Sequence, residues 1–242
     1  MKIAIHQPDF FPWLGYFHKL NLVDKFVHFD HVEAPTGKHW TSRNKILLGG
    51  EEKWLTIPIK KKGKLDQKYY QIEINYESNF KRKHLGTIQQ AYRKSEFYDE
   101  IFPVVKEIYD REHKLLLDFN RDFIDTVSAR LGVQTDIFSS KELLFENPNL
   151  VQLSGNNLIL ELCVLLEATE YISGTGCLDF IDPLSFERKG VKFKFQNFTC
   201  HTYHQVTSQS KFVSHLSILD AIFNIGFDGV KKIISDSMVK EV

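Results

Sequence analysis

The sequence predicts an α/β fold, and three observations support the prediction. The chain opens with a strand, a helix and a second strand, its middle has helical spacing, and its last third alternates short strands with helices. Hydrophobic residues form 43% of the 242 residues, with 20 Phe and 9 Tyr, which is enough for a packed core. We expect a mixed sheet with flanking helices. An α+β arrangement stays open, because further strands cluster before residue 78.

The opening of the chain predicts a βαβ unit. The short apolar run Lys2–His6 predicts a strand that ends at Gln7–Pro8. A helix is expected within residues 12–26, because apolar residues recur there at helical spacing: Trp13, Leu14, Phe17, Leu20 and Val23. Residues 26–32 predict the second strand, which should pair in parallel with the first.

A β-rich region follows this opening unit. Two breaks divide it, namely the Gly49–Gly50 pair and a basic loop at residues 60–64, which is a lysine run in a glycine-containing turn. Strands are therefore predicted on either side of these breaks, over residues 38–48, 54–59 and 70–75.

Residues 79–131 have helical spacing. Ser95 and Pro103 interrupt the pattern, and Gly132 is suited to end a helix, because glycine readily adopts the left-handed conformation. We therefore expect two or three helices in this region.

The last third of the chain alternates strands with helices. Its predicted elements are strands over residues 133–139, 171–172 and 191–198, and helices over residues 156–167 and 217–224, the second helix ending at Gly226. The last of these strands alternates apolar and polar residues, as a half-exposed strand does. No repeat or linker interrupts the chain. We expect one domain over residues 1–242, with sub-regions 1–78, 79–132 and 133–242.

The charge balance limits the classes of partner. Lys and Arg total 31, and Asp and Glu total 31, so the chain has no net charge to attract DNA or another polyanion. RNA binding would need a local cationic patch, for which the candidates are residues 60–64 and 81–84.

Other features bear on location and redox chemistry. No stretch reaches the roughly 18 apolar residues of a membrane helix, so no membrane partner is expected. A histidine and a proline fall within the first ten residues, before an apolar signal core can form, so we expect a cytoplasmic protein. The cysteines Cys163, Cys177 and Cys200 lie far apart, so neither a disulfide framework nor a metal site is predicted.

Two strand ends carry candidate binding groups. His6 and Gln7 follow the first strand at the carboxyl end, where open parallel sheets bind ligands and where a helix N-terminus favours anions. Ser173 and Gly174 follow a later strand and offer backbone N–H groups to an anion. Each pair has a plain alternative: His6 could cap its turn, and Ser173–Gly174 could form an ordinary turn.

Two further segments combine polar and aromatic groups. The first offers a carboxylate, an aromatic plane, a guanidinium and an amide, which suit phosphate, carboxylate or sugar recognition: Asp30, Trp40, Arg43 and Asn44. In the second, Lys83 and His84 fall in the first turn of a predicted helix, where cations oppose the helix dipole. They either bind an anionic ligand or pair with carboxylates elsewhere.

Several motifs in order resemble one family. The segment from His6 to Phe17, HQPDFFPWLGYF, resembles the WbqC-like family of bacterial proteins encoded among polysaccharide biosynthesis genes. The resemblance continues along most of the chain: Trp40 with Arg43–Asn44, Lys83–His84 with Thr87–Ile88 and Tyr92, Tyr171–Gly174, and Leu216–Asp220 with Phe223–Asn224 and Gly226. The sequence departs from the family at Cys177, near Cys200–His201 and at His215, where glycine or proline is common.

The resemblance implies a role in O-antigen assembly, including a proposed transfer of glycine onto an amino sugar of a nucleotide-sugar precursor. We therefore expect an acyl- or aminoacyltransferase, or a ligase, that forms an amide on an amino-sugar nucleotide. Amide formation needs an activated carboxyl group, a deprotonated amine and donors for the oxyanion. ATP with Mg²⁺ or a pre-activated donor, a tRNA-linked one included, could supply the activation.

These expectations assign roles to the candidate residues. His6 is expected to act as a general base or to bind phosphate, and Arg43 and Lys83 to bind phosphate. Asp30 is expected to orient the amine or sugar, and Trp40 to stack on a ring. The expected catalytic set is His6, Asp30, Lys83 and His84. The expected substrate-binding set is Gln7, Tyr16, Trp40, Arg43, Asn44, Ser173, Gly174, Asp220 and Asn224.

A second hypothesis involves no chemistry. A carbohydrate- or nucleotide-binding accessory protein of the same pathway could use the rings of Trp40, Tyr16 and Tyr203 to bind sugar faces. The opening unit is also faintly similar to nucleotidyltransferase-type α/β folds, which include ligases that act through acyl-adenylates. Those folds carry a Gly-His pair where Tyr16 stands here, so this similarity makes ATP a candidate and no more.

Overall fold

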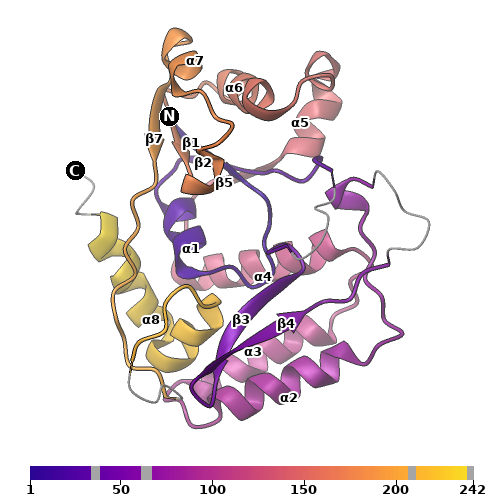
Figure 1. Cartoon of the computed structure of the whole chain (residues 1–242), viewed down its shortest axis with the longest axis vertical. Helices are drawn as coiled ribbons and strands as arrows, with labels where there is room; N and C mark the ends of the chain where they lie inside the picture. The colour runs from indigo at the N-terminus through magenta and orange to yellow at the C-terminus, as the bar shows by residue number, and fades with distance from the viewer. Residues whose placement is uncertain (34–38, 61–66, 207–210, 239–242) are drawn as a thin grey trace. The chain divides into compact units, whose positions relative to one another are not determined.

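The α/β fold is confirmed in a computed structural model, which describes residues 1–33, 39–60, 67–206 and 211–238 (Figure 1). The chain divides into two units. Unit 1 comprises Met1–Gln7, His18–His31 and Val133–Phe198, and unit 2 comprises Pro8–Phe17, Val32–Gly132 and Thr199–Val242. Helix α1 (Leu14–Asn21) runs from unit 2 into unit 1.

Unit 1 is built on a five-stranded parallel sheet in the order β5-β2-β1-β6-β7. Its strands are β1 (Lys2–His6), β2 (Lys25–His28), β5 (Asp136–Ser139), β6 (Glu170–Ser173) and β7 (Lys192–Phe195). Strands β1 and β2 pair in parallel with His6 opposite His28, so the predicted βαβ opening is confirmed. On its other side β1 pairs with β6, from the last third of the chain.

One face of this sheet carries a large apolar cluster of unit 1. Ile3 and Ile5 of β1 and Val27 of β2 belong to one buried cluster with residues of α6 (Gly155–Leu165) and α5 (Ser140–Glu146). Side chains alternate along a strand, so His6 lies on the face opposite Ile3 and Ile5. This cluster therefore lies on one face, and His6 belongs to the other face, on which Ala4 and Phe26 are also buried.

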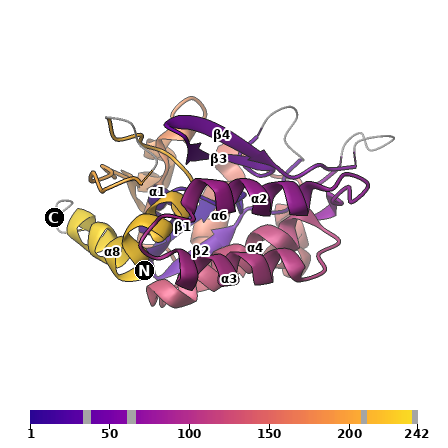
Figure 2. The same ribbon diagram turned by 90° about the horizontal axis from the view of Figure 1, so that it is seen from below.

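Unit 2 combines an antiparallel hairpin with helices. Its main elements are β3 (Arg43–Leu48), β4 (Glu51–Thr56), α2 (Phe80–Tyr92), α3 (Tyr98–Asp110), α4 (Leu116–Leu131) and α8 (Ile218–Met238). Figure 2 shows α2 next to the hairpin. Aromatic rings fill the core, with ring centroids 4.2 Å apart for Phe10 and Phe11 and 4.4 Å apart for Phe11 and Phe123.

The helical middle matches the prediction except at one residue. Helices α2, α3 and α4 are present, and Gly132 ends α4 with a φ of 72° while its N–H donates to the Ala129 carbonyl. The predicted break at Pro103 is wrong, because α3 continues through it. The proline lies in the second turn, where it removes only the hydrogen bond to the Asp99 carbonyl.

The predicted strand over residues 70–75 is also wrong. A 3₁₀ helix covers Tyr69–Gln71, and only isolated bridges follow it, from Glu73 and from Ile74. The buried residues explain this difference. Tyr69 and Ile72 are three positions apart, which suits a 3₁₀ turn rather than the two-residue period of a strand.

The last third of the chain follows the predicted alternation, with two short helices added. Helices α5 and α7 (Pro183–Arg188) were not expected, whereas β7 has the predicted alternation of half-buried and exposed residues. The predicted helix end at Gly226 is confirmed, because its non-helical backbone separates two helical stretches of α8, but the second stretch, which runs to Met238, was not predicted. Gly226 has a φ of 66°, and a Cβ at this position would lie 2.7 Å from the Phe97 ring.

Candidate functional site

The topology of unit 1 marks one edge of its sheet as the place for a ligand. The chain leaves β1 for β2 on one side and later places β6 on the other side of β1. In open parallel sheets, ligands bind beyond the carboxyl ends of the two strands where the order reverses. Here β1 ends at His6 and β6 ends at Ser173. We call this edge the sheet-edge site and assign to it His6, Gln7, Lys19, Asp30, Ser173 and Gly174.

His6 combines partial exposure to solvent with a neutral ring. Its backbone carbonyl accepts a hydrogen bond of 2.9 Å from the N–H of Phe29, which fixes the end of β1. Burial lowers the pKa of His6 well below 6.5, and the positive charges of Lys19 and His28 act in the same direction. The imidazole is therefore neutral at pH 7 and able to accept a proton.

Lys19 places an ammonium group at the strand-order reversal. Its residue is only 2% exposed, although lysine is seldom fully buried. A Cβ built on Gly174 would lie 3.5 Å from the Lys19 Nζ, so the ammonium lies beside the end of β6. Since its charge also acts on His6, Lys19 connects the two strand ends of the site electrostatically.

Asp30 connects β2 to the start of α5. Its buried carboxylate accepts three hydrogen bonds, from Ser139 Oγ at 2.7 Å, Ser140 Oγ at 3.0 Å and the Lys141 N–H at 2.9 Å. These donors hold the carboxylate in place and fix the geometry of the edge. The expected contact of Asp30 with an amine or a sugar stays a prediction.

The end of β6 is held by the residues that follow β7. The Ser173 carbonyl accepts a hydrogen bond of 2.7 Å from the Gln196 N–H, and Ser173 Oγ donates to the Gly174 carbonyl at 3.2 Å. Gln196 also contacts His18 Nδ1 of α1 at 2.9 Å through its side-chain amide. Gln7, at the end of β1, is partly exposed. The sheet-edge site thus combines fixed, buried groups with the partly exposed His6 and Gln7.

The segment after β1 enters unit 2 in a strained conformation. Phe11 is buried and has a φ of 44°, in the left-handed region that suits glycine. Two hydrogen bonds hold it there, from the Asn44 side-chain amide to the Phe11 carbonyl at 2.8 Å and from the Phe10 N–H to the Trp40 carbonyl at 2.9 Å. Asn44, expected to bind substrate, is buried and positions this strained segment.

Tyr16 is buried beside the same segment. Burial raises the pKa of Tyr16 well above 10, and the negative charge of Asp9 adds to this. In the same unit the Pro8 carbonyl accepts hydrogen bonds from the Tyr69 hydroxyl and, at 3.0 Å, from the Asn120 amide. The HQPDFFPW motif is therefore anchored by buried contacts, and sugar binding by Tyr16 stays a prediction.

Asp220 lies at the centre of a closed polar network in unit 2. Its carboxylate accepts hydrogen bonds from the Tyr92 hydroxyl at 3.0 Å, the Tyr203 hydroxyl at 2.8 Å and the Gln205 amide at 2.7 Å. Asn224 accepts from the Val206 N–H and donates to the Asp220 carbonyl. Burial raises the pKa of Asp220, while the three donors counteract this shift. We call Asp220, Tyr92, Tyr203, Gln205 and Asn224 the Asp220 cluster.

The structure places His84 in the first turns of α2, as predicted, with both ring nitrogens in use. Nε2 accepts from the Thr56 N–H at 3.1 Å, so Nδ1 carries the proton and donates to the Tyr109 hydroxyl at 2.8 Å. Burial lowers the pKa of His84 to about 4. Its neighbour Lys83 is exposed and lines a hollow between β4 and α2. His84 joins the hairpin to the helices, whereas Lys83 is accessible.

Trp40 and Arg43 lie on the surface of the hairpin region. Trp40 is 49% exposed, and its ring centroid lies 5.5 Å from that of Trp54, which is 37% exposed. The Arg43 guanidinium stacks 3.8 Å from the centre of the Trp54 ring. Of the predicted basic loop, Lys60 forms an ion pair with Glu73, and residues 61–64 lie outside the described residues.

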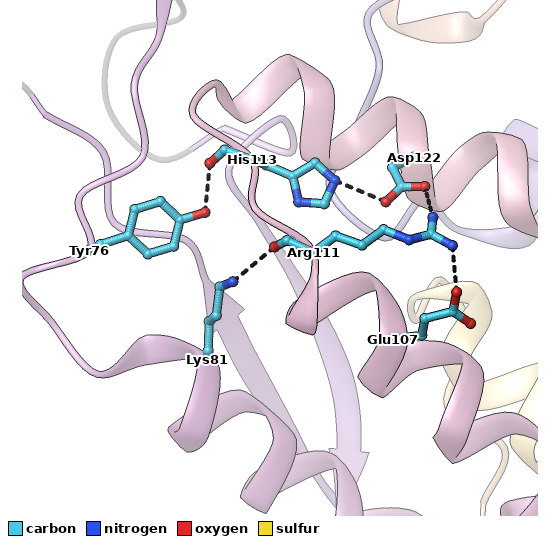
Figure 3. Close-up of polar contacts among 6 residues, drawn as sticks. All are labelled: Tyr76, Lys81, Glu107, Arg111, His113 and Asp122. Atoms are coloured by element: carbon cyan, nitrogen blue, oxygen red, sulfur yellow. Dashed lines mark hydrogen bonds and ion pairs between the residues drawn. The ribbon is translucent and has the colours of Figure 1, made fainter.

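A second polar network, not predicted from the sequence, joins the end of α3 to α4. Figure 3 shows that Arg111 pairs with Glu107 and Asp122, and that Asp122 contacts His113 Nε2 at 2.9 Å. The Tyr76 hydroxyl donates to the His113 carbonyl at 2.7 Å. His113 is nearly buried, so this aspartate–histidine pair fixes a helix junction rather than facing solvent.

Two of the cysteine thiols have raised pKa values, and no cluster of metal ligands occurs in the described part of the chain. Burial raises the pKa of Cys163 and raises that of Cys200 to about 11, so neither thiol is activated. No group of three or more His, Cys, Asp or Glu residues suited to a metal ion occurs there. None of the helices in these residues is long and apolar enough to cross a bilayer.

The predicted residues thus fall into three groups. His6, Gln7, Asp30, Ser173 and Gly174 share the edge of one sheet. Trp40, Arg43 and Lys83 are on the surface of unit 2. The others make buried contacts in unit 2: Tyr16, Asn44, His84, Asp220 and Asn224.

Sequence reasoning missed Lys19 and Trp54. Lys19 is a cation in the short helix that follows β1 along the chain, and Trp54 alternates with buried Leu55 in β4. The position of Lys19 in its helix and the alternation of residues along β4 were therefore the sequence features from which these two residues could have been identified.

Comparisons with known proteins agree with the motifs. A model of the WbqC-like protein family matches residues 7–232. The chain is also 27% identical over 227 residues to the uncharacterized protein Rv1507c of Mycobacterium tuberculosis, covering 93% of this chain and 94% of that protein. No solved structure matches the chain. Since the family model spans nearly the whole sequence, the chain belongs to the WbqC-like protein family.

Proposed function

We propose that the protein transfers an acyl or aminoacyl group, of the glycine type, onto the amino group of an amino-sugar nucleotide. The reaction would serve surface-polysaccharide biosynthesis in the cytoplasm. The observation that carries this proposal is the sheet-edge site, where neutral His6 and the buried ammonium of Lys19 meet at the strand-order reversal. Family membership supports the choice of pathway.

The site suits the nucleotide part of such a substrate. The Lys19 ammonium offers a positive charge to a diphosphate, and the backbone after Ser173 offers N–H groups. A buried ammonium beside the strand ends would interact strongly with the negative charge of a diphosphate. Arg43 and Lys83, on unit 2, stay predicted phosphate ligands.

The chemistry requires a base near the amine. The amine nitrogen attacks the carbonyl carbon of the activated donor, and His6 accepts the proton that the nitrogen loses as the C–N bond forms. The bond to the leaving group then breaks, and the leaving group keeps the electron pair. A backbone N–H after Ser173 would stabilise the oxyanion in between. Activation comes from ATP with Mg²⁺ or from a pre-activated donor.

The variant His6→Asn tests this proposal. Wild-type protein is incubated with UDP- and dTDP-amino sugars and with glycine plus ATP and Mg²⁺, a glycyl thioester or glycyl-tRNA, and the amide product is measured by mass spectrometry. We expect His6→Asn to lower turnover about 10²- to 10⁴-fold with little change in nucleotide-sugar affinity. His39→Asn, an exposed histidine of unit 2, is the matched control.

Two results would contradict the proposal. Full turnover in His6→Asn would remove the histidine from the mechanism. Tight nucleotide-sugar binding by the wild type without turnover with any donor would favour the alternative, a non-catalytic binding protein of the same pathway.

A further inference from the structure

A groove runs along α2 in unit 2 and is separate from the groups that form the sheet-edge site. Its larger hollow, of about 730 Å³, lies between β4 and the first half of α2. A smaller hollow, of about 320 Å³, lies by the last turn of the same helix, and Gln90 lines both. Figure 2 shows α2 lying beside the hairpin that forms the other wall. We call the two hollows together the α2 groove.

The α2 groove is cationic although the chain as a whole has no net charge. Residues 79–95 contain five cations and no aspartate or glutamate: Lys81, Arg82, Lys83, Arg93 and Lys94. Arg82 and Lys83 line one end, with Lys53 of β4, and Arg93 and Lys94 line the other. Among the described residues, no carboxylate lines either hollow or pairs with Arg82 or Lys83. A positive helix start opposes the helix dipole, so an anionic ligand would relieve this repulsion.

Exposed aromatic rings adjoin the cations. Trp54 lines the larger hollow, and the exposed Trp40 ring lies beside it. The Arg43 guanidinium stacks on the Trp54 ring, so a planar group already covers one face of this ring. Trp40 and Trp54 thus form an exposed aromatic pair beside the cations, and aromatic rings of this kind can stack on bases.

The length of the α2 groove decides the size of the ligand. Arg82 and Arg93 are eleven residues apart on one helix, which is about 16 Å at 1.5 Å per residue. The phosphates of one nucleotide cannot reach both ends. A cationic groove with aromatic rings is the arrangement that binds single-stranded nucleic acid, because phosphates meet the cations and bases stack on the rings.

We propose that the α2 groove binds a single strand of RNA. If the acyl-transfer proposal holds, this RNA carries the aminoacyl donor. The identity of the RNA rests on the proposed function, whereas RNA binding by the groove does not. Trp54 would stack on a base, while Arg82, Lys83 and Lys94 would contact phosphates. Gly86 lies between the two ends of the groove and has only a hydrogen as its side chain. A Cβ at this position would have no neighbouring atom within 4 Å and would project into the groove.

Fluorescence anisotropy with a labelled 12-nucleotide RNA tests this inference on the full chain without any need for turnover. We expect saturable binding that weakens with salt. The double variant Arg82→Glu/Lys83→Glu should lower affinity at least tenfold and reduce the salt slope by about 1.4, which is about 0.7 for each of two lost phosphate contacts. Trp54→Ala should lower affinity about tenfold through lost stacking.

Matched variants separate these effects from net charge and from misfolding. Lys106→Glu/Lys231→Glu makes the same charge change at exposed lysines outside the groove and should leave binding within about twofold of the wild type. Gly86→Ala should raise thermal stability yet weaken RNA binding, an outcome that damage to the fold cannot produce.

Absence of saturable binding at low salt would overturn the inference. An equal loss of RNA affinity in both double variants would also overturn it. So would a protein that binds heparin or duplex RNA as tightly as the single strand, with no effect of Trp54→Ala. Each of these results would leave the His6→Asn test of acyl transfer unaffected.

Discussion

The Asp220 cluster of unit 2 and the sheet-edge site of unit 1 both contain buried ionisable groups in different surroundings. Asp220 is fully buried and accepts three hydrogen bonds from side chains of its own unit. At the sheet edge, His6 is partly exposed and neutral, and the Lys19 ammonium lies beside a glycine that leaves room next to it. The first arrangement is closed, whereas the second offers its polar groups to a ligand.

This difference separates two uses of buried polar residues. A carboxylate whose oxygens accept hydrogen bonds from neighbouring side chains stabilises the fold, and removing it leaves donors unpaired. A buried cation at a strand-order reversal beside a glycine is a candidate for binding an anionic ligand. Substitutions at the two places should therefore affect different measurements.

The largest expected effect on stability is at Asp220. Asp220→Ala leaves two tyrosine hydroxyls and one amide buried without their acceptor, so we expect the free energy of unfolding to fall by about 4 kcal/mol. Urea denaturation followed by circular dichroism measures it. Asp228→Ala, at an exposed ion pair on the same helix, should change stability by less than about 0.5 kcal/mol. Equal effects of the two variants would show that the cluster is not a closed network.

The pH dependence of stability should come next in size. The pKa values of His84 and His18 are lowered to about 4 in the folded chain, so between pH 6.5 and pH 4 the unfolded state binds more protons. The stabilisation is fully present above pH 6.5 and is lost as pH falls toward 4. We expect His84 alone to account for about 2–3 kcal/mol of this loss.

The variant His84→Gln checks this assignment. It should flatten the decline of urea-denaturation free energies between pH 6.5 and pH 4.5, although its stability at pH 7 is lower. An unchanged decline would mean that His84 does not carry the effect.

A smaller effect, of opposite sign, is expected at Lys19. Lys19→Met keeps the length of the side chain but removes a buried charge, so unfolding free energy should stay the same or rise by about 1 kcal/mol. Urea denaturation of Lys19→Met and of Lys2→Met, at the exposed amino end of β1, makes the comparison. A loss above about 2 kcal/mol would place Lys19 with Asp220 as a structural residue.

The smallest effect is predicted at Gly86. This glycine lies inside α2 with open space around its Cα, so Gly86→Ala should stabilise the protein by about 0.5–1 kcal/mol. Gly226→Ala is the matched contrast, because the Phe97 ring lies within 2.7 Å of the position of its new Cβ. Thermal melting should shift upward for the first variant and downward for the second, and the same direction for both would contradict the structure.

Much of the fold could be predicted from the sequence, because local patterns specify it. The strand ends at His6 and Ser173, the helix start before Lys83 and the helix end at Gly132 all follow from spacing and turn residues. The strand order did not follow, since pairing of β1 with β6 joins segments about 168 residues apart. Pro103 misled the prediction because it is accommodated in the second turn of α3, and the helical stretch after Gly226 was missed.

The candidate site was predictable only in part. Polar residues at strand ends gave His6 and Ser173, because the carboxyl edge of a parallel sheet is a local property of each strand. Residue type alone could not reveal the buried hydrogen bonds of Asp220 and Asn44, since their partners come from distant segments. The burial of Lys19 depends likewise on packing that spacing does not encode.

Calorimetric titration of UDP- and dTDP-amino sugars into the wild type, Lys19→Met and Lys2→Met tests the sheet-edge site most directly. If a nucleotide sugar binds there, the wild type and Lys2→Met should bind it alike, and Lys19→Met should bind it at least tenfold more weakly while remaining fully folded. Equal affinity in all three proteins would contradict the assignment of the ligand to this edge of the sheet.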